Sequence, residues 1–76
     1  MPRAFQIQAE DNVATMMDDA TAGPVEIIGA SHATITAAEK IPHGHKIALR
    51  DIAANEAVIK FGMRIGHATS AIPRGA

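Results

Sequence analysis

Apolar and polar residues alternate over a short stretch at the start of this chain. Phe5 and Ile7 are each followed by a glutamine, which is the period-two pattern of a half-buried strand. An apolar run, residues 13–17, follows the turn-like residues 10–12. The pattern predicts strand, turn and strand over residues 4–17, and a short helix that begins in the turn is the alternative.

Two β-branched runs follow, at residues 25–28 and 32–36, and a Gly-Ala-Ser segment separates them. Because Val, Ile and Thr favour strands, the two runs predict a hairpin. Further apolar runs at residues 47–49 and 58–61 are bounded by turn residues. Residues 37–40 are too few for an independent helix. The whole pattern predicts an all-β domain of short strands, with at most one or two short helical turns.

One four-residue pattern occurs twice. Ile41-Pro42-His43-Gly44 returns 31 residues later as Ile72-Pro73-Arg74-Gly75. Proline fixes φ and glycine permits a corner, so each copy predicts a turn that launches a strand. The second copy stands at the end of the sequence, which predicts an unpaired β edge or groove there. We expect a large subunit or a second copy of the chain to fill it, and hence a homo-oligomer when the chain is isolated.

The length and composition set further limits. The 76 residues predict a single domain, residues 1–76, and contain no cysteine to stabilise it. No stretch has the length of a membrane span and the start lacks a signal-peptide core, so we expect a cytoplasmic protein without a membrane partner. Two aromatic residues and a net charge of −1 argue against a nucleic-acid partner.

The net charge hides an asymmetry between the two halves. Residues 1–39 carry six acids and one base, whereas residues 40–76 carry six bases and two acids. Three of the four histidines also lie in the second half. A basic, histidine-bearing half suits a small anion or an acidic partner surface. The alternative is that the two halves attract each other in the fold.

His43-Gly44-His45 is the first group of residues that could carry chemistry. In an extended backbone, residues two apart point to the same face, so the pair could hold one metal ion or one anion. Imidazoles suit iron, zinc and similar divalent ions, but a third ligand must come from elsewhere. The alternative is that His43 decorates a turn while His45 bonds to backbone carbonyls.

Lys46, Arg50 and Lys60 form the second group. Arginine can hold a carboxylate or phosphate through two hydrogen bonds, and lysine can hold it as a point charge. A solvated strand edge is the alternative, because lysine is common there. Asp51 is expected to bond to the amides that follow it. No Ser-His-Asp pattern, phosphate-binding loop or dinucleotide glycine pattern occurs.

The stretch GHKIALRDIAANEAVIKFGMRIGHAT resembles the SAF domain of the altronate/galactarate dehydratase family. The opening Asp-Asn-Val-Ala, residues 11–14, matches as well, so the resemblance covers nearly the whole chain. Asn55 stands where the family usually has glycine, and Phe61 replaces the usual tyrosine. The motif positions are Gly44, His45, Lys46, Arg50, Asp51, Lys60, Gly62 and Gly66.

The resemblance implies a β-clip fold and a role beside a large catalytic portion. That portion eliminates water from a sugar acid or related hydroxy acid, with a divalent, iron-like metal. The implied protein is the small subunit of a hydro-lyase and is not active alone; the small subunit of sulfolactate sulfo-lyase is similar. The alternative is a non-catalytic SAF module that binds a carboxylate or a protein partner. The ligand-binding candidates are His43, His45, Lys46, Arg50 and Lys60, and the candidate metal ligands are His43 and His45.

Overall fold

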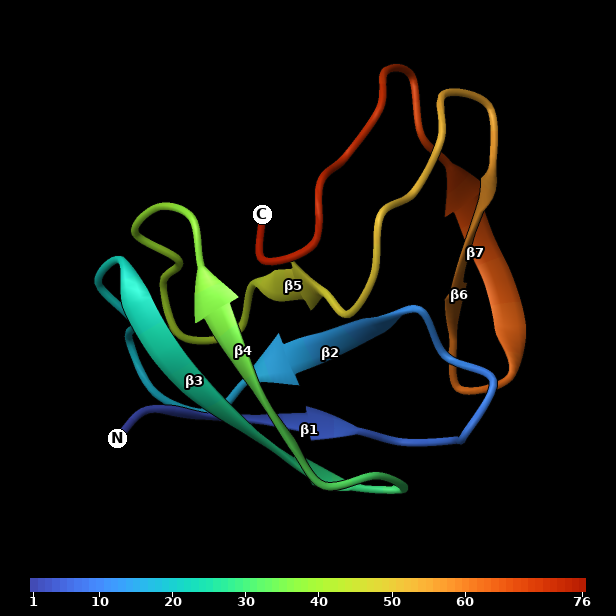
Figure 1. Cartoon of the computed structure of the whole chain (residues 1–76). Coiled ribbons are helices and arrows are strands. Elements are labelled where there is room, and N and C mark those ends of the chain that lie inside the picture. The colour runs from blue at the N-terminus through green and yellow to red at the C-terminus, as the bar shows by residue number, and fades with distance from the viewer.

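The computed structural model describes residues 1–76, which form seven short strands joined by turns (Figure 1). The strands are β1 (Arg3–Gln6), β2 (Val13–Met16), β3 (Gly23–Gly29), β4 (Ala33–Ala37), β5 (Lys46–Ala48), β6 (Ala57–Lys60) and β7 (Met63–His67). No helix is present, so the predicted all-β class is confirmed. It follows that no element of the structure is a candidate membrane-spanning helix.

Five of the strands form one sheet, in the order β4-β3-β1-β2-β5. The antiparallel pair β1–β2 matches the predicted strand, turn and strand, and β3–β4 is the hairpin that the two β-branched runs predicted. β1 and β3 instead pair in parallel, with Ala4 opposite Ile27. This pairing was not predicted, because β2 and its loops separate the two strands in the sequence. Figure 1 shows the sheet curling so that its edge strands, β4 and β5, come near each other.

The core inside the curled sheet is built from alanine, methionine and branched aliphatic side chains. In β3, Val25 and Ile27 are buried and the intervening Glu26 is exposed, as a period of two requires. In β1 the buried and exposed faces are the reverse of what the sequence pattern indicates. The polar Gln6 is buried, whereas the apolar Phe5 is 42% exposed. The ten core residues are Ala4, Ala14, Met16, Ala20, Val25, Ile27, Ile35, Ala37, Ile41 and Ile47.

The two copies of the Ile-Pro-x-Gly pattern adopt the same turn. The residue after each glycine donates its N–H to the proline carbonyl, at 3.1 Å in both copies. Gly44 and Gly75 have φ values of 84° and 90°, in the left-handed region. A third turn has the same form, with Asn55 at φ 68° and a 3.0 Å bond from Glu56 N to Ala53 O. Asn55 stands where the family usually has glycine, and its φ shows that it takes the left-handed conformation that Asn accepts better than other non-glycine residues.

Each of these turns runs into the same kind of β-bulge. The left-handed residue donates its N–H to the carbonyl of one residue in a neighbouring segment. The N–H of that neighbouring residue donates in turn to the carbonyl of the residue that follows the left-handed one. The shared residue is Met16 for the turn at Gly44, Ala68 for the turn at Asn55 and Ala48 for the turn at Gly75. The Ile-Pro-x-Gly echo is therefore a repeated structural unit.

The last of the three turns joins the two edges of the sheet. Gly75 N–H donates to Ala48 O at 2.9 Å, and Ala48 N–H donates to Ala76 O at 2.9 Å. On the other side, Ala38 N–H donates to Gly75 O at 2.9 Å. Since Ala38 follows β4 and Ala48 ends β5, the segment closes the gap between the edge strands.

The β6–β7 hairpin forms a separate two-stranded sheet. Its turn residues Phe61 and Gly62 have φ values of 62° and 67°. Asn12 ties the hairpin to the larger sheet: its side-chain amide donates to Ala57 O at 2.9 Å and its carbonyl accepts from Ile59 N at 2.7 Å. The Asp11 carboxylate also accepts from Gly62 N at 2.7 Å, so two adjacent residues hold the hairpin in place.

The Asp11 carboxyl makes the hairpin attachment sensitive to acid. Burial raises its pKa, but backbone N–H donors, chiefly those of Gly62 and Gln8, outweigh burial and hold the pKa below the ordinary value of 3.8. A lowered carboxyl pKa contributes stability that is present above the unfolded-state value and is lost as the pH falls through the folded-state value.

We therefore expect Asp11→Asn to lose stability near pH 7 and to show a smaller further loss on acidification to near pH 3 than the unmodified chain. Thermal unfolding of both proteins at the two pH values measures the difference. Glu56, whose pKa the Arg50 side chain lowers, titrates in both proteins and serves as the shared background. Equal losses on acidification in the two proteins would contradict the role of Asp11.

Candidate functional site

The histidine pair lies at the first of the three turns. His43 and His45 are both exposed, and they flank Gly44. The His43 backbone N–H donates to the Asp19 carboxylate at 2.8 Å. Because Gly44 is left-handed, the segment is a turn and lacks the extended backbone that the metal prediction assumed. The structure contains no group of three or more His, Cys, Asp or Glu side chains that could hold a metal ion.

The cationic candidates come from three different places in the fold. Lys46 opens β5 and is exposed, Arg50 follows β5 and is exposed, and Lys60 ends β6 and is half-buried. No hydrogen bond or salt bridge links any two of the five predicted ligand-binding residues. Their joint role in binding stays a prediction.

The predicted motif residues have different roles. Gly44 and Gly62 occupy left-handed turn positions, whereas Gly66 lies in β7 with an open space beside it and no positive φ. The expectation for Asp51 was wrong, because its carboxylate accepts from Arg74 N at 2.8 Å, across 23 residues of sequence. Asp51 therefore fixes the closing turn.

The basic half of the chain is not neutralised by the acidic half. The single salt bridge joins Arg50 Nη2 to Glu56 Oε2 at 2.5 Å, and both residues lie in the second half. Asp18 and Asp19 bond to backbone N–H groups of Arg3 and His43. Since no ion pair crosses between the halves, the excess positive charge remains available to a ligand or a partner.

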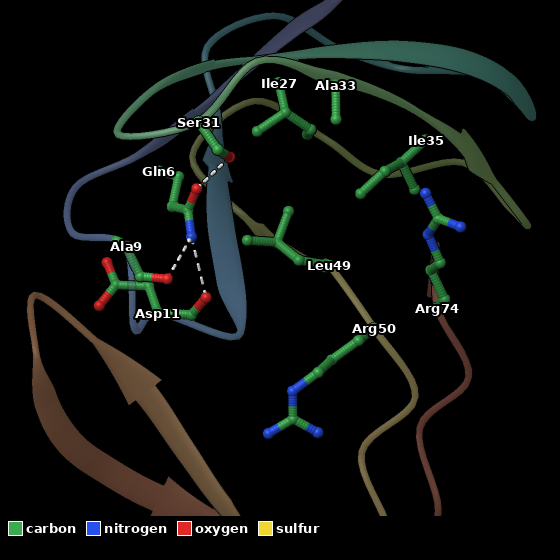
Figure 2. A pocket seen from close by; sticks show the side chains of 10 residues that line it. All are labelled: Gln6, Ala9, Asp11, Ile27, Ser31, Ala33, Ile35, Leu49, Arg50 and Arg74. Atoms are coloured by element: carbon green, nitrogen blue, oxygen red, sulfur yellow. Dashed lines mark hydrogen bonds between the residues drawn. The ribbon is translucent and has the colours of Figure 1, made fainter.

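A pocket of about 280 Å³ lies within the curl of the sheet (Figure 2). Ile27, Ile35 and Leu49 give it an apolar floor. Figure 2 shows the Arg74 side chain beside Ile35, on the side of the pocket away from Gln6 and Ser31. The remaining lining residues are Ala9, Asp11, Ala33 and Arg50.

Gln6 forms a fixed polar wall of this pocket. Its side-chain amide donates to Asp11 O at 3.0 Å and to Ala9 O at 3.3 Å, and its carbonyl accepts from Ser31 Oγ. These bonds allow a glutamine to be 4% exposed without an unpaired polar atom. Gln6 therefore shapes the pocket, and the Ser31 hydroxyl keeps lone pairs free to accept from a ligand.

The two arginines at the pocket differ in availability. Arg50 is held by Glu56 and also donates to the Asp51 carbonyl at 3.0 Å. The guanidinium of Arg74 makes no hydrogen bond or salt bridge within the chain, while the Arg74 backbone is fixed by Asp51. The Arg74 guanidinium is thus a cation with five free donors, which suits a carboxylate.

Sequence reasoning named only Arg50 among the residues that line the pocket. Gln6 was assigned to the polar face of a strand, and Ser31 to a linker. Arg74 was treated only as a turn residue. The one available signal was the echo, which places Arg74 at the position that His43 occupies in the first copy.

A scan against family models matches residues 2–76 to the altronate/galactarate dehydratase SAF domain. Since the match covers all but the first residue, the chain belongs to this SAF-domain family. The resemblance found in the sequence is therefore confirmed.

Curated relatives agree with this assignment. Galactarate dehydratase (L-threo-forming) of Escherichia coli is 43% identical over 83 aligned positions, covering 97% of this chain and 14% of the relative. Altronate dehydratase of Bacillus subtilis is 36% identical over 75 positions, covering 99% of this chain and 15% of the relative. The α subunit of (2R)-sulfolactate sulfo-lyase of Chromohalobacter salexigens is 46% identical over 37 positions, which are 49% of this chain and 39% of that subunit. The chain thus spans about one seventh of the two dehydratases.

Proposed function

We propose that this chain is the SAF component of a sugar-acid dehydratase and works with a larger catalytic portion that removes water from the substrate. The observation that carries the proposal is the coverage: nearly the whole chain matches the dehydratases, yet it spans only 14–15% of their length. The remaining portion of such a dehydratase would carry out the elimination, and the SAF component alone would have no activity.

The arrangement as a separate small subunit is supported by the sulfo-lyase relative. That protein is itself described as a subunit. The 37 aligned positions make up 39% of it and 49% of this chain. A protein that is similar to half of this chain therefore occurs as one subunit of a lyase. By analogy, we place this chain as the small subunit of a cytoplasmic hydro-lyase with a β-clip fold.

The divalent metal implied by the family does not fit this chain alone. His43 and His45 supply two imidazoles, and no third ligand group accompanies them. Two ligands make a weak site, so the catalytic portion would have to supply the other ligands. We assign no reaction step to a metal held by these residues.

Purification of the chain from its natural host tests this proposal. We expect a second chain to remain bound, mass spectrometry to identify it as the catalytic portion of a dehydratase, and the complex to eliminate water from galactarate or altronate. The purified 76-residue chain should show no elimination by itself. A bound chain unrelated to dehydratases, or a complex inactive on sugar and hydroxy acids, would contradict the proposal.

The pocket favours a second candidate function, a SAF module that binds a carboxylate. Its volume accommodates a small organic acid, its floor is apolar, and Arg74 supplies an unpaired guanidinium at the rim. The lone pairs of Ser31 add a place for a hydroxyl group of the ligand.

For this candidate we expect Arg74→Ala to weaken galactarate binding to the isolated chain by roughly 10-fold or more, the value of a charged hydrogen bond. Isothermal titration calorimetry measures the affinity. Arg64→Ala is the matched control, because Arg64 is an exposed arginine on β7 and does not line the pocket. Equal effects of the two substitutions would indicate non-specific charge attraction.

A further inference from the structure

The β6–β7 hairpin exposes large apolar side chains that nothing in the chain covers. Phe61 is 59% exposed, Met63 is 67% exposed and Ile65 is 51% exposed. Met63 and Ile65 both lie in β7, where Ile65 is the extra residue of a bulge opposite Val58 and Ile59. All five residues of β7 are exposed. Figure 1 shows the hairpin standing at one end of the molecule, apart from the curled sheet.

A ribbon of this kind is poorly stabilised by itself. A two-stranded hairpin is marginally stable in water unless one face packs on another element. Here Val58 packs on the small cluster of Val13, Ala48, Ile52 and Ala68, while the opposite strand has no cover. The fold thus holds the hairpin in position through Asp11 and Asn12 and leaves its apolar residues free for contact.

The conformation of Phe61 is a second, independent observation. Its φ of 62° places a bulky residue in the left-handed region, where Asn or Gly is the usual occupant of such a two-residue turn. Residues held in unfavourable backbone conformations cluster at functional sites. An exposed aromatic side chain that is kept at the hairpin tip in a costly conformation indicates a contact that requires the ring.

The charge of the hairpin selects the partner. Between Ala57 and His67 there are two permanent cations, Lys60 and Arg64, and no acid. The nearest exposed acid is Glu10, which lies against Gly62 at the tip. Neither cation makes a salt bridge within the chain. Two copies of the hairpin would repel each other, whereas an apolar surface bordered by carboxylates would complement both the side chains and the charge.

We propose that the β6–β7 hairpin is the surface by which this chain docks on the catalytic portion of the dehydratase. Phe61, Met63 and Ile65 enter an apolar depression on that portion, and Lys60 and Arg64 pair with acidic residues at its rim. This inference rests on the proposed function, because the partner is the catalytic portion that makes up the other six sevenths of the related dehydratases.

The test uses Escherichia coli galactarate dehydratase from which the segment matching this chain has been removed. This protein is titrated into the 76-residue chain, and the affinity is measured by calorimetry at low and at high salt. We expect the unmodified chain to bind, and to bind more weakly at high salt, because exposed charges at the rim are screened.

Two variants and one control identify the surface. Phe61→Asn should leave the isolated chain at least as stable, since Asn accepts the left-handed backbone, and should weaken docking by 10-fold or more. The double variant Met63→Thr with Ile65→Thr should keep the hairpin and weaken docking similarly. Met17→Thr, at an exposed methionine outside the hairpin, should change neither property.

The outcomes separate the two proposals. Binding by the unmodified chain that is lost in the hairpin variants and kept in the Met17 control supports the docking surface. Binding that all variants retain overturns the docking surface and leaves the proposed function standing. An unmodified chain that does not bind the shortened dehydratase counts against the proposed function, and the docking proposal falls with it.

Discussion

Gly75→Ala is expected to lower the melting temperature of the chain by roughly 12 to 24 °C, the equivalent of about 3 kcal/mol in a domain of this size. Gly75 has a φ of 90°, which costs an alanine about 1–2 kcal/mol. A Cβ at this position would also press on the Thr36 carbonyl, and overpacking adds about 1–3 kcal/mol. The bonds of Gly75 to Ala38 and Ala48 close the sheet, so the strain falls where the two edges meet.

Gly44→Ala is the matched control for this effect. Gly44 occupies the same turn with a φ of 84°, but a Cβ there meets nothing within 4 Å. We expect it to cost only the backbone term, about 1–2 kcal/mol. Thermal unfolding of the two variants measures the difference. If both substitutions lower the free energy of unfolding equally, the turn at Gly75 does not close the sheet as described.

Asn12→Ala is expected to destabilise the chain by about 3 kcal/mol and to release the β6–β7 hairpin first. The Asn12 side chain is 2% exposed, and its loss would leave Ala57 O and Ile59 N without their partners. Each unsatisfied buried group costs about 1–3 kcal/mol.

Hydrogen exchange locates this loss within the fold. The amides of β6 and β7 should exchange faster in Asn12→Ala, because Asn12 bridges the hairpin and the large sheet. Asn12 makes no hydrogen bond to β1, β3 or β4. The amides of these three strands should therefore keep most of their protection against exchange. Uniform loss of protection across all strands would show that the hairpin is not a separately anchored unit.

The local part of this fold could be predicted from the sequence. Strand runs and turn residues are coded by neighbours in the chain, so β1–β2 and β3–β4 were found with their turns. The parallel pairing of β1 with β3 depends on segments that are 23 residues apart in register, and no local pattern encodes it. The buried phase of β1 was misread for a similar reason, since the partners that satisfy Gln6 include Ser31, 25 residues away.

Residue type predicted two of the three equivalent turns. Two copies were visible because proline and glycine mark them. The third turn, Ala53-Ala54-Asn55-Glu56, contains neither proline nor glycine, and alanine carries no turn signal, so the residue types did not reveal it. Its geometry matches the other two because Asn55 takes the left-handed position.

The candidate site was predicted only in part. Charge and residue type drew attention to the basic half of the chain, and Arg50 lies at the pocket. Arg74 and Ser31 reach the same pocket from segments 43 residues apart, and only the closing turn and the curl of the sheet bring them there. Spacing in the sequence could not reveal that. The prediction of a shared ligand for the two histidines assumed an extended backbone. Gly44, which lies between them, is left-handed, so the backbone turns there.

The rate of water elimination from galactarate tests the central claim most directly. It is measured with the Escherichia coli dehydratase that lacks its matching segment, before and after addition of this 76-residue chain. If the chain is the SAF component of a dehydratase, the shortened enzyme should be impaired alone, and the chain should raise its rate in a saturable manner. A rate that stays unchanged at saturating concentrations of the folded chain would contradict the account.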